Sequence, residues 1–169
     1  SYSGEQTDKQ EQDRSHRERN QGGLHRVIQP RQSQIWAVLR SDDDIHRTRY
    51  SLIAGFLGRL CISGEIFDLP DENWQTVLDA VEFYGEIRHI IKDGFTSVIE
   101  CTVEDYSKPE GYQIVFRETE NEGILIAHTF GNGANPPVEK YLKNRKIKKE
   151  FGSSLDADFR SRCYILEKG

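Results

Sequence analysis

The sequence has no methionine, no glycine-rich phosphate-binding loop and no GxSxG nucleophile motif among its 169 residues. The two missing motifs leave P-loop nucleotide-binding proteins and α/β-hydrolases without support. An interior without methionine is unusual and agrees with a fragment of a longer protein. We find no complete catalytic set in the sequence.

Cysteine and long apolar runs are also scarce. The three cysteines, Cys61, Cys101 and Cys163, lie in apolar contexts without CxxC spacing, and their odd number argues against a closed disulfide framework. No apolar run reaches the roughly 18 residues of a membrane helix, and no charged-then-apolar leader is present. We therefore expect a cytoplasmic protein, with a signal peptide on a missing N-terminus left open.

Positive charge does not dominate, because 23 Lys and Arg face 28 Asp and Glu, for a net charge of -5. Such a chain has no global field that attracts nucleic acid or an anionic membrane. The one basic run, Lys140–Lys149, carries apolar residues between its lysines. We interpret it as an edge strand protected by lysines rather than a nucleic-acid surface. No nucleic-acid or membrane partner is expected.

The segment from Thr48 to Gly94 organises the chain as helix, strand, helix. Its strand, Leu60-Cys61-Ile62, is apolar on both faces, as in a parallel strand covered by helices. A strand buried on both sides needs neighbours that the rest of the chain does not obviously supply. We therefore expect an α/β body that begins before residue 1.

The second helix of this segment, over 73–94, has apolar residues near i, i+3, i+4 and i+7 spacing. Pro70, Asp71 and Glu72 suit its start, and Gly94 is expected as a left-handed stop. The predicted apolar stripe consists of Trp74, Val77, Leu78, Val81, Tyr84 and Ile91.

The N-terminal part divides at Pro30. Residues 1–29 are polar and are predicted to be a disordered or non-native tail. The run RQSQIWAVLR, at 31–40, is predicted to be a short helix after a proline. Three acids follow at 42–44, and we interpret them as capping residues of the next helix rather than a metal site.

Beyond Gly94 the pattern becomes strand-like, with short β-branched and aromatic runs separated by turns. The runs at 111–119 and 123–131 flank the turn ENEG, so 112–130 is predicted to be a hairpin. Further strands are predicted at 95–104, 146–152 and 160–169. These strands predict an antiparallel sheet or β-sandwich over 95–169, separated near Asp93 from an α/β domain over 30–94.

The acids Glu65 and Asp68 directly follow the buried strand. In a barrel of alternating strands and helices, the active site lies at the carboxyl ends of the strands. We therefore predict that Ser63, Gly64, Glu65 and Asp68 form the rim of a substrate pocket, where small residues let substrate approach the backbone. The alternative is that they are turn and capping residues.

The segments RQSQIWAVLR, YSLIAGFLGRLCISGEIFDL and ENWQTVLDAVEFYGEIRHIIKDG resemble the end of the catalytic barrel in melibiase-type α-galactosidases, which are retaining glycoside hydrolases. The likeness covers about 31–169, including the closing strand RCYILE. It is carried by order and spacing, at Gly55, Phe56, Leu57, Gly58, Tyr84, Arg88, Ile91 and Gly94.

This resemblance implies the terminal helix-strand-helix portion of a (β/α)8 barrel followed by an antiparallel β-sandwich. It also implies a parent enzyme that cleaves terminal α-galactosides by double displacement. The two catalytic aspartates of such enzymes lie on earlier barrel strands, so this chain has no catalytic residue to match them. We expect an inactive C-terminal fragment that binds carbohydrate, an α-galactoside, only as part of the complete enzyme. We expect no metal or other cofactor.

An alternative is a non-catalytic carbohydrate-binding or interaction module. Exposed aromatic residues on one sheet face would favour it, and Tyr106, Tyr112 and Phe130 are the candidates. An incomplete barrel would expose apolar helix faces, which predicts self-association into a homo-oligomer or partial disorder around 31–94.

Overall fold

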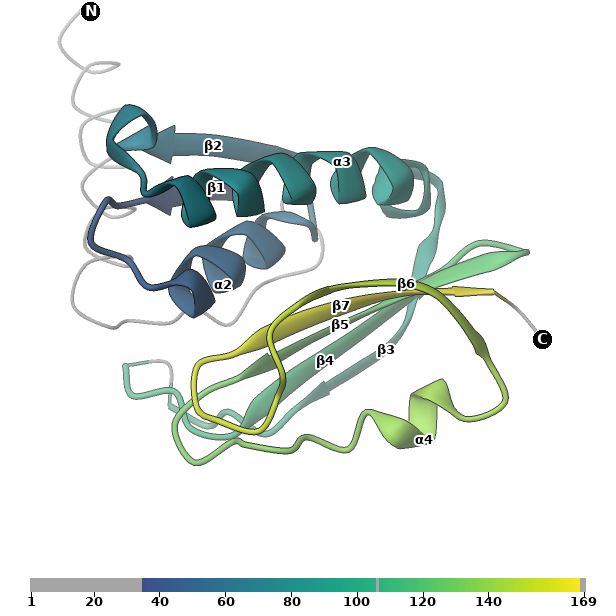
Figure 1. Ribbon diagram of the computed structural model, residues 1–169. Helices are drawn as coiled ribbons and strands as arrows, with labels where there is room; N and C mark the ends of the chain where they lie inside the picture. The colour runs from purple at the N-terminus through teal and green to yellow at the C-terminus, as the bar shows by residue number, and fades with distance from the viewer. Residues whose placement is uncertain (1–34, 106, 168–169) are drawn as a thin grey trace, which may run out of the picture.

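The structure is a computed structural model that describes residues 35–105 and 107–167. It has three layers, with two helices between a small parallel sheet and a larger antiparallel sheet (Figure 1). The predicted tail over 1–29 lies outside the described residues. One hydrophobic cluster joins the helices to both sheets, and the division into domains near Asp93 stays a prediction.

The small sheet pairs β1 (Ile35–Leu39) with β2 (Leu60–Gly64) in parallel. The predicted helix over 31–40 is therefore wrong for its described part. Ala37 and Leu39 are buried whereas Val38 is half-buried, which is the period of two that a strand produces. A short apolar run does not distinguish a buried strand from a helix by pattern alone.

The prediction that β2 is a parallel strand is confirmed. The predicted burial of β2 on both faces is not confirmed, because its residues Leu60 to Ser63 are only half-buried. Within the described residues β2 has one neighbouring strand, β1, so one edge of each strand is unpaired there.

Helix α2 (Ile45–Gly55) connects the two parallel strands. The capping role predicted for the acids at 42–44 is confirmed for Asp44, whose carboxylate accepts a hydrogen bond from the Arg47 backbone N–H at 2.7 Å. This bond satisfies one of the free amides of the first helical turn.

Helix α3 (Asp71–Asp93) follows a single 3-10 turn, η1 (Ile66–Asp68), and its first turn carries the predicted acids Asp71 and Glu72. Gly94 ends it, but with φ -76° rather than in the left-handed region. Close packing explains this glycine, since a Cβ would come 2.4 Å from the Ile90 carbonyl oxygen.

The buried face of α3 is displaced from the predicted stripe. Trp74, Leu78 and Val81 are 41%, 46% and 49% exposed. Polar residues occupy part of the buried face, because hydrogen bonds to other elements satisfy their polar groups. The Asn73 amide donates to the Asp43 carbonyl and to the Thr48 hydroxyl, both at 2.9 Å. The buried face consists of Asn73, Thr76, Val77, Ala80, Phe83, Ile87 and Ile90.

The larger sheet is antiparallel, as predicted, with strand order β3-β4-β5-β7-β6. The hairpin prediction is confirmed by pairing from Tyr112 with Thr129 to Glu118 with Gly123. Within the described residues this part has one five-stranded sheet rather than the two facing sheets of a sandwich. Its strands are β3 (Phe95–Cys101), β4 (Tyr112–Glu118), β5 (Glu122–Thr129), β6 (Lys146–Gly152) and β7 (Ser161–Glu167).

The lysine-rich run is an edge strand in part. Strand β6 lies at the edge of the sheet, as predicted, whereas the preceding residues form a short helix, α4 (Glu139–Leu142). Residues on α4 and the neighbouring loops, including Leu142 and Leu155, pack on the outer face of the sheet.

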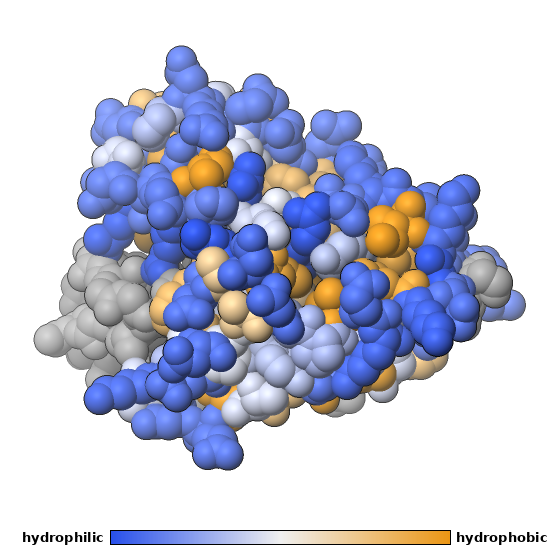
Figure 2. All heavy atoms as spheres, turned by 60° about the horizontal axis from the view of Figure 1, so that its bottom comes forward, coloured by the Kyte–Doolittle hydropathy of each residue, from blue (hydrophilic) through white to orange (hydrophobic). Residues whose placement is uncertain are grey.

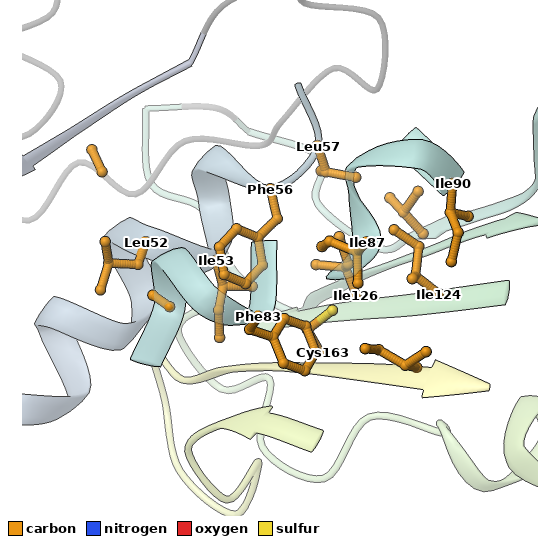
Figure 3. Close-up of a cluster of buried hydrophobic side chains, with 14 of the residues drawn as sticks. Leu52, Ile53, Phe56, Leu57, Phe83, Ile87, Ile90, Ile124, Ile126 and Cys163 are labelled. Carbon is orange, nitrogen blue, oxygen red and sulfur yellow. The ribbon is translucent and has the colours of Figure 1, made fainter. Parts of the chain in front are cut away.

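The main core lies between the two helices and the inner face of the larger sheet (Figure 3). Phe56 of the α2–β2 turn stacks on Phe83 of α3, with ring centroids 5.7 Å apart. Cys163 lies in the same cluster, and its burial raises the pKa of the thiol. The helices are thus fixed to the larger sheet by a continuous apolar contact.

Candidate functional site

The carboxyl ends of β1 and β2 lie side by side, because the two strands are parallel and in register up to Leu39 and Gly64. The next residues join the two loops. The Glu65 carboxylate accepts hydrogen bonds from the backbone N–H and the hydroxyl of Ser41, at 2.8 and 2.9 Å. These bonds lower the pKa of Glu65, so its carboxylate is ionised and held at this edge.

Gly64 has a structural role at the same edge. Its φ is +105°, and a Cβ there would lie 2.1 Å from the Leu39 carbonyl oxygen. Only glycine fits so close an approach in the left-handed region. Ser63 is half-buried beside Val38 in the strand pairing. The predicted contact of both residues with substrate stays a prediction.

The turn after Glu65 exposes two side chains to water. Asp68 is exposed at the end of η1, and Phe67 is 101% exposed. Phe67 is not among the predicted rim residues, because a residue in a turn has no periodicity that reveals its exposure. An exposed aromatic ring next to carboxylates can contact the apolar face of a ligand while the acids accept its hydrogen bonds.

A second acid at this edge has the opposite electrostatic environment. The Asp43 carboxylate accepts a hydrogen bond from the Arg40 backbone N–H at 3.0 Å. Burial raises the pKa of Asp43, and that hydrogen bond and Arg47 offset part of the rise. Acids whose pKa values are displaced in opposite directions are common in active and binding sites, and structural hydrogen-bond networks produce them too.

Residues from the family resemblance meet behind this edge. The Tyr84 hydroxyl donates to the Gly58 carbonyl at 2.8 Å and accepts from the Leu60 N–H at 3.3 Å. The Tyr84 ring also stacks on Phe56, with centroids 5.9 Å apart. These contacts fix the turn that leads from α2 into β2, and so the start of the strand that carries the candidate site.

The aromatic residues proposed for a binding module are not an exposed platform. Phe130 is fully buried, and Tyr112 is half-buried with its hydroxyl donating to Glu100 at 2.6 Å. Tyr106 lies outside the described residues.

Two absences within residues 35–105 and 107–167 concern other kinds of function. No group of three or more His, Cys, Asp or Glu residues there is arranged to hold a metal ion. None of the helices there is long and apolar enough to cross a membrane.

No protein-family model matches the sequence, and a search of curated proteins finds no significant match. Among solved structures, the chain is similar to the galactosidase domain of the alpha-galactosidase-sucrose kinase AgaSK, with 9% sequence identity and a TM-score of 0.48. The match covers 79% of this chain and 21% of that one, so the chain spans about a fifth of the length of the matched structure.

Proposed function

We propose that this chain is the C-terminal part of an α-galactosidase-like glycoside hydrolase. In this proposal β1, α2, β2 and α3 are two successive βα units of a (β/α)8 barrel, and the five-stranded sheet belongs to the domain that follows. The complete enzyme hydrolyses terminal α-galactosides by a retaining double displacement, and the isolated chain is inactive.

The observation that carries the proposal is the small parallel sheet. Parallel strands occur in sheets whose faces are covered and whose strands have neighbours. Within the described residues, β1 and β2 each leave one edge unpaired, and β2 is only half-buried. Additional strands on these edges would satisfy the backbone groups and complete the burial.

The exposed stripe on α3 supports the same conclusion. Trp74, Leu78 and Val81 follow i, i+4, i+7 spacing, so they lie on one side of the helix. A neighbouring βα unit of a barrel would cover such a stripe. Self-association of the isolated chain through this surface stays a prediction.

The galactosidase assignment within the barrel proteins rests on the sequence resemblance. Its support in the fold is that the two resembling segments contact each other through Phe56, Gly58 and Tyr84. These contacts determine where β2 begins, and thereby the position of the loop with Ser63, Gly64, Glu65 and Asp68.

The chain would contribute to substrate binding rather than to bond cleavage. A retaining glycosidase uses two carboxyl groups about 5 Å apart, one as nucleophile and one as acid and then base. Both would come from earlier barrel strands. The Glu65 carboxylate, held by its hydrogen bonds from Ser41, would accept a hydrogen bond from a sugar hydroxyl at the pocket rim. Phe67 and Asp68 would lie beside it.

Hydrolysis of a chromogenic α-galactoside tests the proposal, with the chain alone and mixed with a separately expressed fragment carrying the remaining βα units of the parent barrel. We expect turnover only in the mixture. Trp74→Glu should abolish it by placing a charge in the contact, whereas Asp79→Asn, an exposed position on another side of the same helix, should not.

Two results would contradict the proposal. Turnover by the chain alone would mean that the catalytic carboxylates lie within it. A mixture that forms a stable complex, seen by co-elution in size-exclusion chromatography, but hydrolyses no α-galactoside would exclude the galactosidase assignment.

A further inference from the structure

A hollow of about 400 Å³ lies on the outer side of the five-stranded sheet, between α4 and strands β6 and β7. Figure 2 looks toward this side of the molecule, where hydrophobic side chains gather among hydrophilic ones toward the right of the view. The volume is within the range of small-ligand sites in proteins. The lining residues are Glu139, Leu142, Lys143, Ile147, Glu150 and Tyr164.

The apolar part of the lining comes from three side chains. Tyr164 is 7% exposed and belongs to the outer core, Leu142 packs against that core, and Ile147 is 39% exposed. Ile147 is the most exposed of these apolar side chains, and Leu142 and Tyr164 line the hollow beside it.

Arg162 holds the neighbouring groups in place. Its guanidinium donates to the Glu150 carboxylate at 2.6 Å and to the Gly152 carbonyl at 3.1 Å. The same guanidinium lies 5.7 Å from the centroid of the Tyr164 ring. One lining carboxylate and the aromatic ring are therefore oriented before any ligand arrives, which lowers the entropic cost of binding.

The polar groups of the hollow balance in charge. Glu139 and Glu150 supply carboxylate acceptors, Lys143 supplies an ammonium donor, and Arg162 compensates Glu150. Lys143 would repel a cationic ligand, and Glu139 and Glu150 would repel an anionic ligand. A neutral ligand with hydroxyl groups and an apolar face would meet no like charge.

We propose that this hollow is a binding site for a neutral sugar ring. Its hydroxyls would donate to Glu139 and Glu150 and accept from Lys143, while its C–H face would lie against Leu142, Ile147 and Tyr164. The site is separate from the Glu65 loop, because α2, α3 and the five-stranded sheet lie between them (Figure 1). It involves no bond cleavage and does not require the proposed hydrolase function.

Two-dimensional NMR of the complete chain tests this site by titration with methyl α-galactopyranoside and methyl α-glucopyranoside. At least one of the two sugars should bind and shift the backbone signals of Lys143, Ile147 and Tyr164. No shift with either sugar would overturn the inference. Glu139→Gln and Lys143→Gln should each weaken that binding about tenfold, since each removes a charged hydrogen-bonding partner. Glu167→Gln, on the same sheet outside the hollow, is the matched control.

Three further outcomes would overturn the inference. They are shifts confined to residues around Glu65 and Phe67, binding unaffected by both hollow variants, and tighter binding of galactose 6-phosphate or galactosamine than of the neutral sugars. The first would leave the proposed hydrolase function intact. Conversely, failure to reconstitute α-galactosidase activity would not alter the shifts expected at the hollow.

Discussion

Strand β5 of the five-stranded sheet and strand β2 of the parallel pair differ in how completely they are buried. In β5 every residue after Glu122 is buried, because helices cover one face and the α4 region covers the other. In β2, an equally apolar strand by sequence, no residue is buried. The difference teaches that β5, at the centre of its sheet, finds its partners within the described chain, whereas β2, with one neighbouring strand there, has surface left for others.

The strongest way to test this contrast is to truncate two apolar residues of the same helix. Phe83→Ala should lower the free energy of unfolding by about 3–5 kcal/mol, because the ring is fully buried between α3 and the larger sheet. Val81→Ala, at a position 49% exposed, should change it by less than about 0.5 kcal/mol. Urea denaturation measures both, and equal losses would refute the contrast.

Acid should destabilise the five-stranded side through His128. This residue is 1% exposed, and within the described chain neither ring nitrogen has a hydrogen-bond partner. Burial lowers its pKa from 6.5 to about 3. Between these values the unfolded chain binds a proton that the folded chain does not, so stability falls as the pH falls, by about 1.4 kcal/mol per pH unit.

The His128→Leu variant isolates this effect, because His46 and Glu122 also have displaced pKa values and remain in both proteins. Unfolding in urea from pH 7 to pH 4 should show a shallower loss of stability for the variant. Parallel pH profiles would mean that His128 gains its proton without unfolding.

A pair of glycine substitutions tests the small sheet. Gly64→Ala should destabilise by about 1–3 kcal/mol, because alanine is strained at φ +105° and its Cβ would strike the Leu39 carbonyl. Gly85→Ala should stabilise by about 0.5–1 kcal/mol, because the Cβ meets nothing within 4 Å and alanine favours the helix.

Hydrogen exchange locates the Gly64→Ala effect. The amide of Glu65, which donates to the Leu39 carbonyl at 2.9 Å, should lose protection while β5 amides keep theirs. A uniform loss across both sheets would show that they unfold as one unit.

Local pattern predicted much of the fold, and tertiary contact decided the remainder. The hairpin around ENEG follows from turn chemistry and short-range pairing. In contrast, the five apolar residues of β1 fit a helix equally well, and only pairing with β2 resolves them. On α3, Asn73 is buried because of Thr48 and Asp43, which no helical period reveals.

The candidate sites show the same limit. Glu65 was predicted at the strand end, since position after a parallel strand is visible in the sequence. Its partner Ser41 lies 24 residues away and carries no signal of the contact. The hollow on the outer sheet was missed because it combines residues from α4, β6 and β7, which come together only in the folded sheet.

The smallest expected effect concerns the contact between the two loops of the parallel pair. Replacing Ser41 with alanine removes the hydroxyl bond to Glu65 but leaves the backbone N–H bond. The pKa of Glu65 should therefore rise part of the way toward its ordinary value, with no measurable change in unfolding, because the carboxylate is exposed to water.

An NMR titration of the side-chain carboxyl carbons measures this change, with Glu100 as internal reference. Lys140, Tyr112 and Tyr141 lower the pKa of Glu100 to about 2, on the far side of the molecule from Ser41, so it should not respond. If the pKa of Glu65 is unchanged in Ser41→Ala, the hydroxyl does not hold the carboxylate. The backbone N–H alone would then orient Glu65 at the strand ends, and the side chain of residue 41 would be free to meet a ligand.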